Sequence, residues 1–161
     1  MEYFNPIAML VAAISALVVG FIWYNPKVFG SAWMKAAGVT DEQIKGGNMV
    51  KIFGLALLFA FILSSALPGI VIHQMGALSL VGGVADGALP SYAAFLSDYG
   101  DAFRTFKHGA FHGVLTGIFI VLPILGTNAL FERKSAKYIF INTGYWIVTL
   151  TVMGAIISGW R

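Results

Sequence analysis

Four long, strongly apolar and almost uncharged stretches constrain the fold of this chain more than any other feature of its sequence. They cover residues 7–24, 52–72, 106–130 and 138–160. A helix needs about 20 residues to cross a hydrocarbon core roughly 30 Å thick, and each stretch is close to that length. The sequence therefore predicts an all-α membrane protein, a bundle of four transmembrane helices.

The composition and the connections agree with this prediction. Hydrophobic residues make up 58% of the 161 residues and charged residues only 11%, a balance outside the usual range of soluble domains. The connections leave no room for a second folded module, so residues 1–161 form one domain in which two helical hairpins are joined by a longer outer loop. The lipid bilayer is the expected surrounding, and the first stretch is interpreted as a retained span because no Lys or Arg precedes it.

The distribution of basic residues predicts the orientation of the bundle. Seven lie in or beside the connections after the first and third stretches, and three lie on the other side. The two groups are Lys27, Lys35, Lys45, Lys51, Arg133, Lys134 and Lys137, and Arg104, Lys107 and Arg161. By the positive-inside rule, both termini face outward and the two basic connections face the cytoplasm. Because topology accounts for the basic residues, the net charge of +3 does not indicate a nucleic acid partner.

Short elements are expected in the connections. Residues 31–37 have the pattern of a helix lying on the membrane surface, and Thr40 begins a helix-capping sequence. In the outer connection, the glycine-rich residues 76–88 are expected to form a loop and residues 90–99 a short helix with Pro90 in its first turn. Asp101 is expected to cap the third span.

A row of glycines marks one face of the third span. Gly109, Gly113 and Gly117 recur every four residues, which lets another helix approach closely. Similar rows of small residues occur in the first and fourth spans, at Ala12, Ala16 and Gly20 and at Thr151, Ala155 and Gly159. The glycine row therefore predicts helix packing inside the chain, with a seam between copies in a homo-oligomer as the alternative.

All three histidines of the chain are expected near the outer surface. His108, His112 and Thr116 follow one another at intervals of four residues and share a helix face, while His73 ends the second span. Two imidazoles one turn apart are a recurrent metal-binding arrangement, and His73 or an aspartate could complete a zinc or copper site. The alternatives are a haem ligand, a proton-responsive or substrate-contacting group, and a purely structural role in which His112 bonds to a neighbouring helix. No other cofactor is predicted.

Other polar side chains gather in the cytoplasmic halves of the third and fourth spans. They are Thr127, Asn128, Asn142, Thr143 and Tyr145. A network of interhelical hydrogen bonds across the hairpin is expected there, with the floor of a polar cavity as the alternative. Pro68 and Pro123 are expected to kink the second and third spans.

The sequence lacks the residues that several kinds of chemistry require. The chain has no cysteine, which excludes disulfide and thiolate chemistry. No acidic or basic residue lies deep within a stretch, so the buried carboxylate of a proton-coupled multidrug exporter is missing. No phosphate-binding loop, nucleophile elbow or catalytic carboxylate pair is recognisable, so no catalytic residue is predicted, and a membrane enzyme is the third alternative after the two classes of function given below.

Four segments carry a resemblance to a known family. They are WYNPKVFGSAWMK, FKHGAFHGVLTG, LPILGTNALFERKSAKY and INTGYWIVTLTVMGAIISGW. They resemble the corresponding parts of a bacterial family of small membrane proteins that is catalogued only as a domain of unknown function. The resemblance implies four helices in a bacterial inner membrane and supplies no activity. The positions matching the family pattern are His108, His112, Asn128, Glu132, Arg133, Tyr145 and Trp146.

Two classes of function follow. The chain would bind or transport a small ligand or a metal at an outward-facing histidine site, or it would be a structural protein that associates through its glycine-rich third helix. The candidate ligand-contacting residues are His73, His108, His112, Thr116, Asn128, Tyr145 and Trp146, with His108 and His112 as candidate metal ligands. A cavity that reaches the histidines would favour the first class, and a filled bundle interior the second.

Overall fold

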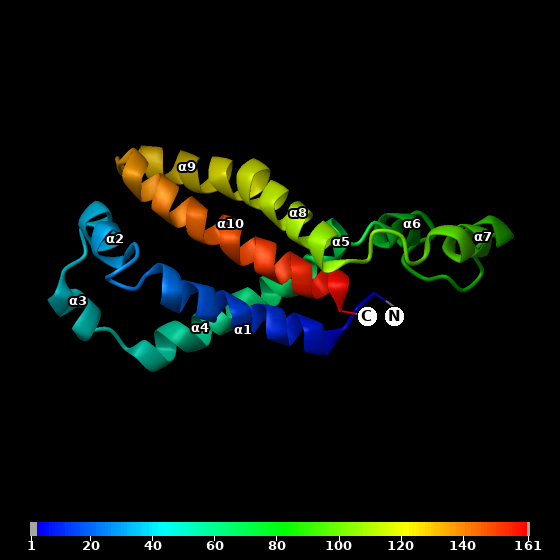
Figure 1. Cartoon of the computed structure of the whole chain (residues 1–161), viewed down its shortest axis with the longest axis horizontal. Helices are drawn as coiled ribbons and strands as arrows, with labels where there is room; N and C mark the ends of the chain where they lie inside the picture. Colours follow the sequence, from blue (N-terminus) through cyan, green and yellow to red (C-terminus); the bar gives the residue numbers. More distant parts are fainter. Residues whose placement is uncertain (1–2, 161) are drawn as a thin grey trace.

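The computed structural model describes residues 3–160, and all regular secondary structure in this range is helical. Four helical segments are long and apolar enough to cross a membrane: Pro6–Trp23, Met49–Val71, Phe106–Phe131 and Ala136–Gly159. Each begins and ends within three residues of its expected position, which confirms the all-α, four-helix prediction (Figure 1). The elements are α1 (Pro6–Trp23), α2 (Gly30–Ala37), α3 (Asp41–Lys45), α4 (Met49–Ala66), α5 (Pro68–Val71), α6 (Gln74–Leu80), α7 (Pro90–Tyr99), α8 (Phe106–Thr116), the π-helical segment η1 (Gly117–Val121), α9 (Leu122–Phe131) and α10 (Ala136–Gly159).

The long helices contact one another in the order α8–α10–α1–α4, with α10 between α8 and α1. At one end α5 also contacts α8 and α10 and so closes the row. Both ends of the chain and the connection containing α6 and α7 lie at this end, here called the terminal end (Figure 1). The opposite end carries α2, α3 and the turn between α9 and α10, and is called the basic end.

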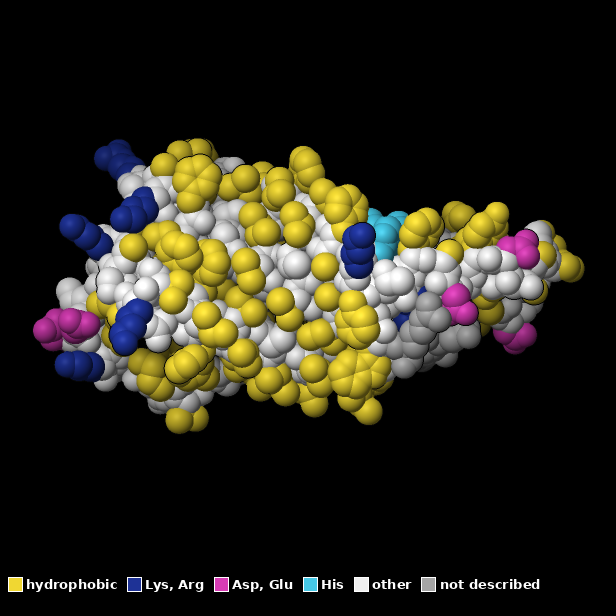
Figure 2. All heavy atoms as spheres, viewed as in Figure 1, with side chains coloured by type: hydrophobic (Ala, Val, Ile, Leu, Met, Phe, Trp, Pro, Cys, Tyr) yellow, Lys and Arg dark blue, Asp and Glu magenta, His cyan; other side chains and the backbone are white. Residues whose placement is uncertain are grey.

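The surface has the distribution of side chains that a bilayer requires. Hydrophobic side chains cover the long helices, basic side chains cluster at the basic end, and acidic ones lie mainly at the two extremes (Figure 2). Large apolar side chains point outward along the spans: Phe21 is 79% exposed and Phe119 is 72% exposed. Water would make this exposure costly, so the belt is suited to lipid.

Capping side chains fix where each span begins. Asn5 accepts hydrogen bonds from the backbone of α1, and Asn48, Thr105 and Ser135 do the same for α4, α8 and α10. The prediction that Asp101 caps the third span is wrong. Thr105 takes that role because a capping side chain must directly precede the first turn of its helix.

The glycine row of the third span faces α10. Gly109, Gly113 and Gly117 are buried, and a Cβ atom added at any of them would collide with α10. At Gly113 such an atom would lie 2.7 Å from the Cα of Thr151 and would also meet the backbone of Leu150. Backbones can approach this closely only where side chains are absent, so α8 and α10 form the tightest pair of helices in the bundle.

Pro68 and Pro123 each interrupt the span that contains them. The second span divides at Leu67, and α5 begins at Pro68. In the third span, the π-helical segment η1 ends two residues before Pro123. Proline lacks an amide hydrogen and its ring crowds the preceding turn, and the wider π-helical turn relieves that crowding.

The short helices α2, α3 and α7 confirm the expected elements, and Thr40 and Gln43 form a reciprocal capping box at α3. The expectation of a loop over residues 76–88 is wrong for its first part, since α6 continues to Leu80. Tertiary contact explains the difference: α6 packs against α5 and α7, which offsets the low helix propensity of its glycine. The loop proper contains Gly82, Gly83 and Gly87, all with positive φ.

Candidate metal site

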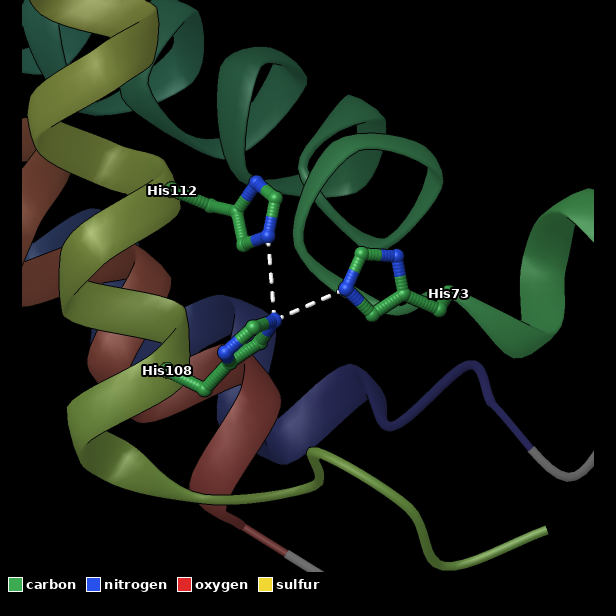
Figure 3. Close-up of side chains that lie close together, drawn as sticks. All are labelled: His73, His108 and His112. Carbon is green, nitrogen blue, oxygen red and sulfur yellow. Dashed lines mark hydrogen bonds between the residues drawn. The ribbon is translucent and has the colours of Figure 1, made fainter. Parts of the chain in front are cut away.

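The three histidines of the chain meet at the terminal end of the bundle (Figure 3). His108 and His112 lie one turn apart on α8, and His73 lies in the turn between α5 and α6. The Nε2 atom of His108 is 2.8 Å from Nε2 of His73 and 3.0 Å from Nε2 of His112. The three residues offer ligand atoms that all lie within 4.8 Å of one another.

Hydrogen bonds alone do not satisfy all three of these imidazole nitrogens. A neutral imidazole nitrogen carries either one proton or one lone pair, so Nε2 of His108 forms one good hydrogen bond but faces two nitrogens. A single cation among the three lone pairs would satisfy all three nitrogens together. With Zn–N bonds of about 2.0–2.1 Å in tetrahedral geometry, neighbouring nitrogens lie about 3.3 Å apart, so the two close pairs would open by a few tenths of an ångström.

The start of α8 holds two of the three imidazoles. The Thr105 hydroxyl accepts the His108 amide at 3.1 Å, which places His108 in the first turn and His112 directly above it. Thr116 lies one turn further along but outside the cluster: it is buried, and its hydroxyl donates to the His112 carbonyl at 2.7 Å. His108 and His112 therefore lie together as predicted, whereas Thr116 contacts the backbone of His112 and does not join the two imidazoles.

A buried glutamine fixes the surroundings of His73. Gln74 is 2% exposed, and its Nε2 atom donates to the carbonyls of Tyr99 and Ala102 at 2.7 and 2.9 Å. These bonds tie the end of α7 and the turn before α8 to the start of α6. The sequence analysis did not single out Gln74, although a polar residue directly after an apolar span and a histidine was a signal for it.

A strained aromatic residue lies beside the imidazoles. Phe103 has φ of +63°, a backbone conformation that residues other than glycine rarely adopt. Its ring centroid is 4.9 Å from that of His108 and 5.5 Å from that of His73. Such strain persists only where neighbours enforce it, and it is frequent at ligand sites. Here it places an aromatic ring over the edge of the histidine cluster.

The cluster is accessible from outside the bundle. His73 is exposed, His108 and His112 are half-buried, and a cavity of about 300 Å³ reaches His73. The cavity is lined by His73, Gln74, Phe95, Tyr99, Ala102 and Phe103. Three imidazoles would leave a fourth coordination position open on a tetrahedral ion, and that position is what distinguishes exchangeable and catalytic sites from closed structural ones.

The other predicted ligand residues lie elsewhere. Tyr145 packs against α1: its hydroxyl donates to the Ala16 carbonyl at 3.2 Å, and its ring lies 5.3 Å from that of Tyr24. Asn128 and Trp146 line a separate cavity of about 370 Å³ between α9 and α10, towards the basic end. The predicted residues are thus divided among three places, of which, among residues 3–160, only the histidine cluster gathers three metal-binding atoms.

The prediction of a hydrogen-bond network between α9 and α10 is wrong, because the polar side chains of α10 bond to α1 instead. Asn142 accepts a hydrogen bond from the Tyr24 hydroxyl at 3.0 Å, so the bond joins α10 to the end of α1. Trp23 adds a second such link by donating its indole N–H to the Ile141 carbonyl at 3.0 Å. Thr127 and Asn128 are exposed on α9 instead. The spacing of these polar residues in the sequence predicted their depth in the bundle, but not which neighbouring helix each face of α10 contacts.

Comparison with known proteins gives a match to a family model over most of the chain. The model of a family described as "Protein of unknown function (DUF1761)" matches residues 7–158, a range that contains all four spans and the three histidines. No curated protein and no solved structure matches the chain.

Proposed function

This chain belongs to the DUF1761 family of proteins of unknown function, and we propose that it is an integral membrane protein that binds a divalent transition-metal ion through His73, His108 and His112. One observation carries the proposal: Nε2 of His108 lies 2.8 and 3.0 Å from the same atom of the other two histidines. The three residues are the only histidines in a chain of 161 residues; His108 and His112 lie in the third span, whereas His73 follows the second.

The ligand atoms define the class of metal. Imidazole nitrogen suits Zn²⁺, Cu²⁺ and related first-row ions, whereas Mg²⁺ and Ca²⁺ prefer oxygen ligands. The chain has no cysteine, so the thiolate ligands of closed structural zinc sites are not involved. Zn²⁺, which accepts three histidines and one exchangeable ligand in tetrahedral geometry, is the principal candidate.

The position of the site supports an exchangeable function. The histidines lie at the terminal end, and we propose that this end and both termini face outward from the cytoplasmic membrane of a bacterium; the seven-to-three distribution of basic residues supports this orientation. An ion would enter from that side beside the exposed His73, without crossing the bilayer. The proposed role is therefore to capture or hold an external metal ion.

Two features favour binding over the other functions considered. Leu67, Leu150 and Met153 are completely buried and fill the interior between the long helices. This filled interior supports binding of a metal ion at the end of the bundle more than passage of the ion through the bundle. The glycine row is covered by α10 within the chain, which makes that face a poor candidate for a seam with another copy.

The test is a calorimetric titration of the metal-free, purified protein in detergent with ZnCl₂, CuCl₂ and MgCl₂. The proposal expects one Zn²⁺ or Cu²⁺ per chain and no binding of Mg²⁺. Alanine at any one of the three histidines should abolish binding of the one metal ion per chain. Asn128→Ala, which changes a polar residue outside the cluster, is the control for these three variants. Zinc binding that survives all three histidine variants would overturn the proposal.

A further inference from the structure

A second site at the other end of the bundle goes beyond the proposed metal binding. The groove between α9 and α10 has a volume of about 370 Å³. Its lining comes from the last residue of η1, from α9 and the residue after it, and from two residues of α10. These residues are Val121, Ile124, Leu125, Asn128, Ala129, Glu132, Tyr138 and Trp146.

The groove changes character along its length. Val121, Ile124 and Leu125 line the part next to the π-helical segment, whereas Asn128 and Glu132 line the part nearest the basic end. The distance along the helix from Val121 to Glu132 is about 16 Å at 1.5 Å per residue. An open groove that is apolar along the span and polar at the basic end matches an acyl chain attached to a polar head group.

The side chain of Glu132 does not stabilise its own helix. Glu132 directly follows α9, where the helix dipole places partial negative charge, so a carboxylate there is unfavourable and a cation is favoured. Among residues 3–160, the carboxylate of Glu132 forms no ion pair and the Asn128 amide forms no hydrogen bond within the chain. Both side chains are exposed at the polar end of the groove. This end is therefore complementary to a positively charged group.

A positively charged side chain lies beside one of the lining residues. The Nζ atom of Lys134 is 5.6 Å from the ring centroid of Tyr138, which lines the groove. Lys134 also donates to the Ala37 carbonyl at 3.1 Å, and this bond holds the ammonium in place. The groove thus has a carboxylate in its lining, at Glu132, and an ammonium beside its lining residue Tyr138, and these two charges match those of a zwitterionic head group.

We propose that the groove between α9 and α10 binds a phospholipid whose head group carries both a phosphate and an ammonium. One acyl chain lies along Val121, Ile124 and Leu125 beside Trp146. The lipid ammonium pairs with Glu132, and the phosphate lies beside Lys134. A phospholipid with a glycerol head group would bring only negative charge to Glu132 and would bind more weakly.

The test is native mass spectrometry of the purified protein with equal amounts of phosphatidylethanolamine and phosphatidylglycerol that have the same acyl chains. Wild-type protein should retain one phosphatidylethanolamine per chain with a preference of roughly five-fold, the upper range for a solvent-accessible ion pair. Glu132→Gln should lose this preference, whereas Glu42→Gln, an exposed carboxylate on α3 at the same end, should keep it. Equal retention of the two lipids by the wild type, or loss of preference in both variants, overturns the proposal.

A second pair of variants tests the acyl-chain part. Leu125→Trp fills the apolar part of the groove and should abolish lipid retention, whereas Leu55→Trp, on the exposed face of α4, should leave it unchanged. Glycerophosphoethanolamine, which has the head group without acyl chains, should not displace the lipid at equal concentration. Retention by Leu125→Trp, or displacement by this soluble head group, contradicts binding along the groove.

Discussion

Nε2 of His108 lies 2.8 Å from Nε2 of His73, although 35 positions separate the two residues in the sequence. Contact between α5 and α8 at the terminal end brings them together. The same nitrogen of His108 lies 3.0 Å from Nε2 of His112, so one atom joins two imidazoles of the third span to the turn that follows the second.

His112→Gln should lower zinc affinity more than about 100-fold, since the loss of an outer partner of a metal ligand already costs 10–100-fold. Glutamine keeps a hydrogen-bonding side chain of similar reach, so the fold should persist. Thr116→Val is the control, because Thr116 bonds only to the His112 carbonyl. Competition with a chromogenic zinc chelator measures both variants. If Thr116→Val is as damaging as His112→Gln, the ligand set is different from the one proposed.

Gln74→Leu should weaken zinc binding roughly 10–100-fold without removing a ligand, because Gln74 positions the turn beside His73 through the Tyr99 and Ala102 carbonyls. A loss of stability of about 1–3 kcal/mol should accompany it, since two carbonyls lose their partner. Gln43→Leu, on α3 at the basic end, is the matched control and should leave zinc affinity unchanged. The positioning role is refuted if Gln74→Leu binds zinc like the wild type while its stability falls.

Gly113→Leu should destabilise the protein by more than the 1–3 kcal/mol typical of overpacking, because the new side chain would meet the backbone of Leu150 and Thr151. Gly54→Leu is the matched control: Gly54 lies in α4 with no atom within 4 Å of an added Cβ. Ala110→Leu, a half-buried position on α8 itself, should be intermediate. Thermal unfolding in detergent separates the three, and equal melting temperatures for Gly113→Leu and Gly54→Leu would mean that α8 does not rely on its glycine face.

The orientation can be tested with single cysteines, since the chain contains none of its own. A cysteine at Ser91 in α7 should react with a membrane-impermeant maleimide in intact cells, and a cysteine at Ser135, before α10, should react only after the cells are lysed. Both serines are exposed, so access through the membrane decides the result. Labelling of Ser135 alone in intact cells would reverse the proposed topology.

Much of the fold could be predicted from the sequence because membrane spans are set by length and hydropathy. The four spans, the surface elements at α2 and α3 and the helix α7 all follow from local patterns. The helix α6 could not be predicted, since its stability comes from burial of Gln74 and contact with α7. Local composition in that segment favoured a loop.

The candidate site was predictable only in part. The four-residue spacing of His108 and His112 placed both on one face, and topology placed His73 at a similar depth. Their convergence within 3 Å depends on how α5 packs against α8, a tertiary contact that no local pattern encodes. For the same reason, Tyr145 and Asn142 were expected to face α9 but contact α1, because helix rotation within a bundle is set by all neighbours together.

The most direct test of the central claim is X-ray absorption at the zinc edge, measured on protein loaded with one equivalent of Zn²⁺. A site formed by His73, His108 and His112 predicts three nitrogen scatterers at about 2.0–2.1 Å, with the outer-shell pattern of imidazole rings and one further light ligand. His108→Ala, which removes the nitrogen shared by both close contacts, should eliminate this imidazole pattern. A spectrum with oxygen ligands and fewer than two imidazoles in the wild type, or an unchanged spectrum in His108→Ala, would contradict the proposed metal site.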